Sequence, residues 1–139
     1  MKRVLVDTGP LVAILSRDDE YHEVCVQALR EMPGPLFSCW PVITEAAWLL
    51  RRSSQVVHRL LQNLDGDFLE LLPLTGSEGA AIAAMMERYK DIQPQLADAA
   101  LVFLAERERI DTLFTLDRRD FSIYRTKKKR SFRIVPEME

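Results

Sequence analysis

The stretch RVLVDTGPLVAILSR, residues 3–17, indicates the fold because an apolar strand passes directly into a helix. Residues 3–6 form a short run of β-branched residues and leucine that ends at Asp7, and residues 11–17 continue as a short helix. Gly9 and Pro10 stand at the start of that helix, where proline is tolerated. The stretch therefore predicts the first strand and the first helix of an α/β protein.

The rest of the chain repeats this alternation of strands and helices. Helices are expected over 20–32, 41–52, 56–64, 77–89 and 94–109, and strands over 36–39, 68–74, 112–116 and 132–135. The strand at 68–74 is mostly apolar, which is typical of a strand buried on both faces of a parallel sheet. The alternation predicts a central, mostly parallel sheet of four to five strands with helices on both faces.

The composition is that of a single globular domain over residues 1–139. The chain has 139 residues, of which 47% are hydrophobic and 29% are charged, and this excludes an intrinsically disordered protein. No apolar run approaches the roughly 20 residues of a membrane span, or the roughly 7–15 residues of a secretory signal. Cys25 and Cys39 lack the CxxC spacing of a zinc site or a disulfide framework, so we expect a cytoplasmic location.

Four carboxylates are expected at one edge of the sheet. Functional groups of parallel sheets gather at the carboxyl ends of the strands, near the point where the strand order reverses. Asp7 and Asp117 each follow an apolar strand. Glu45 and Asp98 each lie four residues after a proline that is expected to open a helix at this same edge.

Such a cluster of acids favours a bound cation. A carboxylate in an apolar stretch is costly to bury alone, and four like charges would repel, so that some would take up protons. Oxygen ligands without His or Cys favour Mg²⁺ or Mn²⁺ over zinc, and the hydroxyl of Thr8 or Thr115 could orient a ligand or a bound water. A Mg²⁺ site of this kind polarises a phosphoryl oxygen and supplies hydroxide near neutral pH, which predicts phosphodiester hydrolysis.

The charge distribution agrees with a nucleic-acid substrate, although the net charge is only −2. Residues 118–133 hold a single acid, Asp120, and eight basic residues: Arg118, Arg119, Arg125, Lys127, Lys128, Lys129, Arg130 and Arg133. These cations could hold a phosphate backbone beside the metal, with Arg118 or Arg119 steadying the substrate. An acidic pocket next to a cationic strip predicts a metal-dependent nuclease.

Each of these features also has a structural explanation. Asp7 and Asp117 could cap a short helix or turn, and Glu45 and Asp98 could occupy helix N-termini, which favour negative charge. The basic run at 127–130 could be a solvated loop. Caps have no reason to share one edge of a sheet, which favours the nuclease, but a non-catalytic RNA- or protein-binding module and a DNA-directed nuclease stay open as alternatives.

Short segments spread over the chain resemble a known family. They are VLVDTGPL at 4–11, TE at 44–45, LADA at 96–99, FTLD at 114–117 and DF at 120–121. In this order they resemble the PIN-domain family, and within it the small VapC-like toxins of bacterial and archaeal toxin–antitoxin pairs. The resemblance implies an α/β/α sandwich, Mg²⁺- or Mn²⁺-dependent endoribonuclease activity on RNA, frequent homodimers, and a small antitoxin protein that covers the active site.

The resemblance also implies roles for particular residues. The family's acidic quartet, which binds metal and carries catalysis, falls on Asp7, Glu45, Asp98 and Asp117. Thr8 and Thr115 match the family's hydroxyl positions. In many members one residue separates the two acids of the last motif, whereas two arginines separate Asp117 from Asp120 here, which leaves the metal role of Asp120 open.

Overall fold

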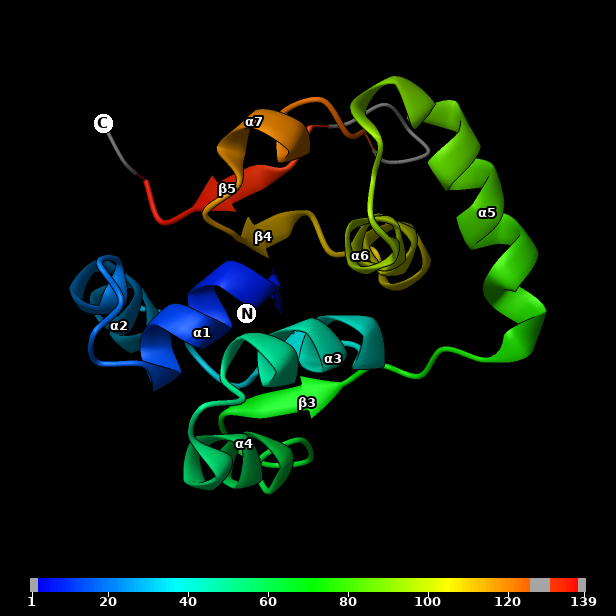
Figure 1. The fold of residues 1–139 in the computed structure, drawn as a ribbon. Coiled ribbons are helices and arrows are strands. Elements are labelled where there is room, and N and C mark those ends of the chain that lie inside the picture. Colours follow the sequence, from blue (N-terminus) through cyan, green and yellow to red (C-terminus); the bar gives the residue numbers. More distant parts are fainter. Residues whose placement is uncertain (1–2, 126–130, 138–139) are drawn as a thin grey trace.

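A five-stranded parallel sheet forms the centre of the protein (Figure 1). The structure is a computed structural model and describes residues 3–125 and 131–137. The strands follow the order β3-β2-β1-β4-β5, and every neighbouring pair is parallel. Their bounds are β1 (Val4–Val6), β2 (Leu36–Ser38), β3 (Leu69–Leu71), β4 (Thr112–Phe114) and β5 (Arg133–Val135).

Helices in the connections between the strands cover this sheet. They are α1 (Thr8–Leu15), α2 (His22–Arg30), α3 (Trp40–Leu49), α4 (Ser54–Leu61), α5 (Gly79–Arg88), α6 (Leu96–Glu108) and α7 (Arg118–Phe121), with 3-10 turns at Gly76–Glu78 and Lys90–Ile92. Crossovers between parallel strands are right-handed. The connections that lead from β1 through β2 to β3 therefore place their helices on one face of the sheet, and the connections that lead back to β4 and β5 place theirs on the other face. The predicted three-layer α/β/α arrangement is confirmed, and the sheet is parallel throughout.

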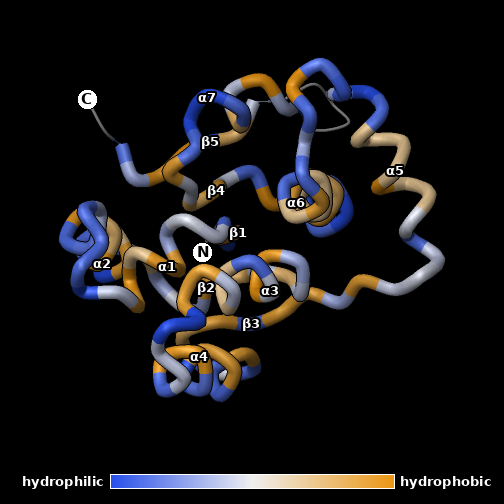
Figure 2. The backbone as a smooth tube through the Cα atoms, in the orientation of Figure 1, coloured by the Kyte–Doolittle hydropathy of each residue, from blue (hydrophilic) through white to orange (hydrophobic). Residues whose placement is uncertain are grey.

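The hydrophobic core lies between the central strands and the helices on either face. All three residues of β1 and of β4 are buried, and Leu5 of β1 is in register with Phe37 of β2 and Leu113 of β4. Helix α6 is buried along most of its length, and alanines at 97, 99 and 100 let it pack closely. By contrast, α7 is hydrophilic (Figure 2).

Three expectations about individual elements are wrong. The strand expected to be buried on both faces is the edge strand β3, in which Leu69 is buried and Glu70 is exposed. Among the described strands it pairs with β2 alone, and on its other side Glu70 forms an isolated bridge with Asp65. The helix expected to open at Pro94 begins at Leu96, because Gln95 has an extended backbone and serves as the N-cap. The first helix also starts earlier than expected, at Thr8, since Asp7 caps it.

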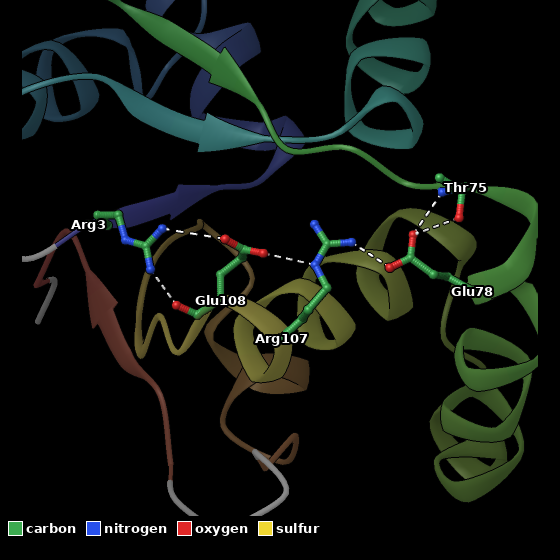
Figure 3. A network of polar contacts seen from close by, with 5 residues as sticks. All are labelled: Arg3, Thr75, Glu78, Arg107 and Glu108. Carbon is green, nitrogen blue, oxygen red and sulfur yellow. Dashed lines mark hydrogen bonds and ion pairs between the residues drawn. The ribbon is translucent and has the colours of Figure 1, made fainter.

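A chain of ion pairs joins β1, α6 and the start of α5 (Figure 3). Arg107 lies 2.5 Å from Glu78 and 2.9 Å from Glu108, whose carboxylate lies 3.6 Å from Arg3. Glu78 also accepts a hydrogen bond of 2.8 Å from the backbone N–H of Thr75, within a capping box. These contacts hold the C-terminal end of α6 in place, and the opposite end of α6 carries Asp98.

The strand order reverses between β1 and β4. From β1 the chain moves outward to β2 and β3, and then returns to place β4 on the other side of β1. Ligands of open α/β sheets bind at such a switch point, at the carboxyl ends of the strands. Within the part of the chain that the structure describes, no helix has the length and apolar character needed to cross a membrane.

Candidate active site

Asp7 lies at the carboxyl end of β1, beside the switch point, and is 8% exposed. Its Oδ1 accepts a hydrogen bond of 2.8 Å from the backbone N–H of Thr8, and its Oδ2 accepts one of 2.8 Å from the Thr115 hydroxyl. The pKa of Asp7 is raised to about 6, mainly by burial and in smaller part by the charges of Glu45 and Asp117, while the two hydrogen bonds oppose this rise. Asp7 is thus both a helix cap and a carboxylate that other acids surround.

Thr115 connects the two loops that meet at the switch point. It follows β4 and is fully buried. Its hydroxyl donates to Asp7 Oδ2 and accepts a hydrogen bond of 3.0 Å from the backbone N–H of Asp117. One side chain therefore fixes the loop after β1 relative to the loop after β4.

Asp117 caps the single-turn helix α7. Its Oδ1 accepts a hydrogen bond of 3.0 Å from the backbone N–H of Asp120, so the capping expected from the sequence is present. The same carboxylate raises the pKa of Asp7 and of Asp98, which places it within electrostatic range of both. Capping and membership of the acidic cluster therefore occur together in one side chain.

Asp98 approaches the cluster from the first turn of α6 and is partly buried. Its pKa is raised to about 7, first by burial and then by the charges of Asp7, Asp117 and Glu45. A hydrogen bond with the Gln95 backbone lowers the pKa and opposes part of this rise. Like charges within a few ångströms make ionisation unfavourable in this way. Acids on four separate elements thus act on one another.

Glu45 is the sixth residue of α3 and is partly buried. Helices α3 and α6 pack against each other, and the Glu45 charge raises the pKa of both Asp7 and Asp98. The neighbouring residue Ala46 is fully buried, and its small side chain lets this part of α3 pack closely on the core. The structure therefore brings all four predicted acids into one region.

The donor chemistry of this region suits a hard divalent cation. The four side chains offer carboxylate oxygens, and Thr8 adds a buried Oγ1 that has no hydrogen-bond partner among the described residues. Within residues 3–125 and 131–137, no three His, Cys, Asp or Glu side chains already stand in an arrangement that could hold a metal ion. The acids thus share a neighbourhood and repel one another without converging on a single point.

The basic residues predicted to contact the substrate differ in whether their side chains already form hydrogen bonds within the protein. Arg118 is partly buried and its Nη1 donates a hydrogen bond of 2.6 Å to the carbonyl of Pro136. Arg119 is exposed on α7, directly after Asp117, whereas Arg125 donates to the carbonyls of Ser122 and Tyr124. The basic run expected at 127–130 lies outside the described residues.

Sequence reasoning missed Tyr124. Its ring is fully buried and lies edge-on to Tyr89 at 4.8 Å, and its hydroxyl has no hydrogen-bond partner among the described residues. Burial raises its pKa, and the charges of Asp98, Asp120 and Asp117 raise it further. A tyrosine in a basic, polar segment gives no sequence signal that it packs behind a cluster of acids.

Comparisons with known proteins bear on the family and the fold of the chain. The family model described as the PIN domain matches residues 4–129. Ribonuclease VapC26 of Mycobacterium tuberculosis (strain ATCC 25618 / H37Rv) is 30% identical over 135 residues, which cover 96% of this chain and 100% of that protein. The crystal structure of Mycobacterium tuberculosis VapC20, titled a sarcin-ricin loop cleaving toxin, superposes with a TM-score of 0.72 at 14% identity. It covers 79% of this chain and 86% of that one, and shows likeness of fold.

Proposed function

The chain belongs to the PIN-domain family, and from this premise we propose that it is a Mg²⁺- or Mn²⁺-dependent endoribonuclease. We propose further that it is the toxin of a type II toxin–antitoxin pair. The observation that carries the proposal is the set of mutually repelling carboxylates at the switch point, of which Asp7 and Asp98 have pKa values raised to about 6 and about 7. The relative named a ribonuclease supports RNA as the substrate.

The four carboxylates have distinct tasks in this proposal. Asp7 and Asp98 are the inner ligands, because burial makes their charges costly without a cation. Glu45 and Asp117 border them from α3 and from the loop after β4. Thr115 holds the Asp7 carboxylate in one orientation, which leaves the remaining lone pairs of that carboxylate for a ligand.

The reaction is hydrolysis of an RNA phosphodiester. When bound, Mg²⁺ or Mn²⁺ polarises the phosphoryl oxygen and lowers the pKa of the attacking water. Burial of Asp7 keeps bulk water away from its carboxylate. The exposed cation of Arg119, at the same edge of the sheet, would contact a phosphate of the RNA. Thr8 follows Asp7, and its hydroxyl, which has no hydrogen-bond partner among the described residues, would orient water or substrate.

The partners proposed for the chain follow from the same site. A cluster of carboxylates attracts cationic side chains, so a small antitoxin protein that places a basic residue at the acids would block both metal and RNA. A homodimer is also proposed, with the exposed apolar residue Leu49 of α3 as a candidate for its contact surface.

A cleavage assay on the purified chain tests the proposal. Single-stranded RNA is incubated with Mg²⁺ or Mn²⁺, with and without EDTA, and the same assay is run on Asp98→Asn. The exposed Asp18 provides a matched Asp18→Asn control. We expect metal-dependent cleavage by the wild type and by the control, and none by Asp98→Asn.

Three outcomes contradict the proposal in different ways. Cleavage that persists in EDTA excludes the role of the metal. Binding of RNA without cleavage under any metal supports the binding module, and equal cleavage of RNA and of DNA with the same sequence supports a DNA-directed or non-selective nuclease.

A further inference from the structure

Trp40 exposes its ring at the edge of the sheet that carries the acids. It is the first residue of α3 and is 58% exposed. Tryptophan combines a large apolar ring with a polar N–H, and it is enriched where proteins contact partners or ligands. The ring of Trp40 is therefore a feature that the acidic cluster alone does not explain.

The position of Trp40 beside Asp7 rests on the residues around it. The preceding residue, Cys39, is fully buried, and burial together with the Asp7 charge raises the pKa of its thiol. Ser38, one residue earlier, donates a hydrogen bond of 3.1 Å to the carbonyl of Val6, which directly precedes Asp7. Five residues further on, Glu45 also acts on Asp7. Residues before and after Trp40 in the sequence thus act on Asp7 or lie beside it, which places Trp40 near the acids.

The backbone that carries the ring is firmly held. The Trp40 carbonyl accepts a hydrogen bond of 2.9 Å from the Thr44 hydroxyl, and Pro41 occupies the first turn of the helix. Cys39, the N-cap, is anchored in the core. A ring on such a support loses little conformational freedom when it binds a flat partner, which favours stacking.

A helix start that presents an aromatic ring next to a phosphodiester site is suited to an unpaired nucleobase. Sequence-tolerant binding of single strands uses stacking on aromatic side chains together with cations that follow the backbone. At this edge Trp40, which follows β2, supplies the ring and the exposed Arg119, which follows β4, supplies the cation, and β1 with Asp7 at its end lies between these two strands. Resting on the proposed nuclease function, we propose that Trp40 stacks on an unpaired base of single-stranded RNA next to the bond that is cleaved.

Trp48 offers a matched control on the same helix. It is 63% exposed, and the guanidinium of Arg51 lies 3.9 Å from the centre of its ring, so one face is already covered. It lies eight residues after Trp40, about 12 Å further along the helix axis and away from the sheet edge. The chain has only these two tryptophans, so each can be studied alone.

Steady-state kinetics give the first test. With single-stranded RNA and Mg²⁺, we expect Trp40→Ala to raise KM by roughly 5- to 150-fold, the loss of one stacked base, with a smaller change in kcat. Trp40→Phe should recover part of that loss, and Trp48→Ala should leave KM unchanged. An oligoribonucleotide with abasic sites around the cleaved bond should bind the wild type and Trp40→Ala equally.

Tryptophan fluorescence gives a readout that does not depend on cleavage. In an Asp98→Asn background, the Trp48→Phe protein reports on Trp40 alone and the Trp40→Phe protein reports on Trp48 alone. We expect single-stranded RNA to quench the first and not the second, and duplex RNA of the same sequence to quench neither.

The outcomes separate this inference from the nuclease proposal. A wild type that cleaves RNA with a KM that Trp40→Ala does not change, and with no quenching of Trp40, overturns stacking and leaves the nuclease intact. A wild type that cleaves nothing overturns the nuclease, while quenching of Trp40 still reports whether the base stacks. A lower oligomeric mass of Trp40→Ala in light scattering, with unchanged KM, assigns the ring to an interface between two copies and also overturns stacking.

Discussion

Replacing Asp7 by asparagine should stabilise the metal-free protein while removing cleavage. Asparagine keeps the shape of the side chain and the hydrogen bond from the Thr8 N–H, which its carbonyl oxygen accepts. Its amide donates to the Thr115 oxygen, so the Thr115 hydroxyl, which donates to Asp7 Oδ2 in the wild type, loses its acceptor. The substitution therefore removes the charge at the cost of one hydrogen bond, which offsets about 0.5–1.5 kcal/mol of the gain. It separates the electrostatic cost of the site from its packing.

The size of the effect follows from the pKa of Asp7, which burial raises from 3.8 to about 6. The folded state then keeps a proton that the unfolded chain releases, so the free energy of unfolding falls as pH rises from about 4 to about 6 and stays low above that. Each unit of pKa shift corresponds to about 1.4 kcal/mol, which gives up to about 3 kcal/mol at neutral pH. Asp7→Asn removes this cost, and it also removes one of the charges that raise the pKa of Asp98.

Urea unfolding in EDTA, at a series of pH values from 4 to 8, measures the effect. We expect Asp7→Asn to exceed the wild type by about 1–3 kcal/mol at pH 7.5 and to differ little from it at pH 4. Asp18→Asn, which alters an exposed acid, should follow the wild type at every pH. Adding Mg²⁺ should stabilise the wild type and leave Asp7→Asn unchanged.

Two results would refute this reasoning. If Asp7→Asn is no more stable than the wild type at pH 7.5, the carboxylate is not under electrostatic strain. If the two proteins lose stability with pH in parallel, the proton that the folded state retains lies elsewhere.

Three further substitutions test other parts of the account. Thr115→Val leaves Asp7 Oδ2 and the Asp117 N–H without their shared partner, so urea unfolding should show a loss of about 1–3 kcal/mol and cleavage should fall at least in proportion to the folded fraction lost. Arg107→Met breaks partly exposed ion pairs, and it should lower unfolding free energy by less than about 1 kcal/mol without changing cleavage. Arg119→Ala removes an exposed cation, and RNA binding measured against salt concentration should weaken and lose about 0.7 of its logarithmic slope.

The alternation of apolar strands with helices was sufficient to predict most of the fold. Strand spacing predicted the parallel sheet, and the prediction of helices on both faces is confirmed. The position of β3 at the edge could not be predicted, because the order of the strands depends on the direction in which each crossover connection runs across the sheet. An apolar run such as 68–74 has the same sequence pattern in a central strand and in an edge strand. The start of α6 was missed because Pro94 can stand within a first turn or just before a cap, and Gln95 is an uncommon N-cap.

The candidate site was predictable as a set of acids, because each one stands at the end of a strand or near the start of a helix. Its supporting contacts were not predictable. The Thr115 hydroxyl reaches Asp7 across 108 positions of sequence, and Tyr124 packs behind the acids with no partner for its hydroxyl in the part of the chain that the structure describes. Such contacts depend on the relative placement of distant loops, which periodicity does not contain.

The most direct test of the central claim is a calorimetric titration of Mn²⁺ into the EDTA-stripped wild-type chain and into Asp98→Asn. The account predicts saturable uptake by the wild type that Asp98→Asn loses, with the Asp18→Asn control behaving as the wild type. Absence of Mn²⁺ uptake by the folded wild-type chain, or equal uptake by Asp98→Asn, would contradict a carboxylate metal site at the switch point.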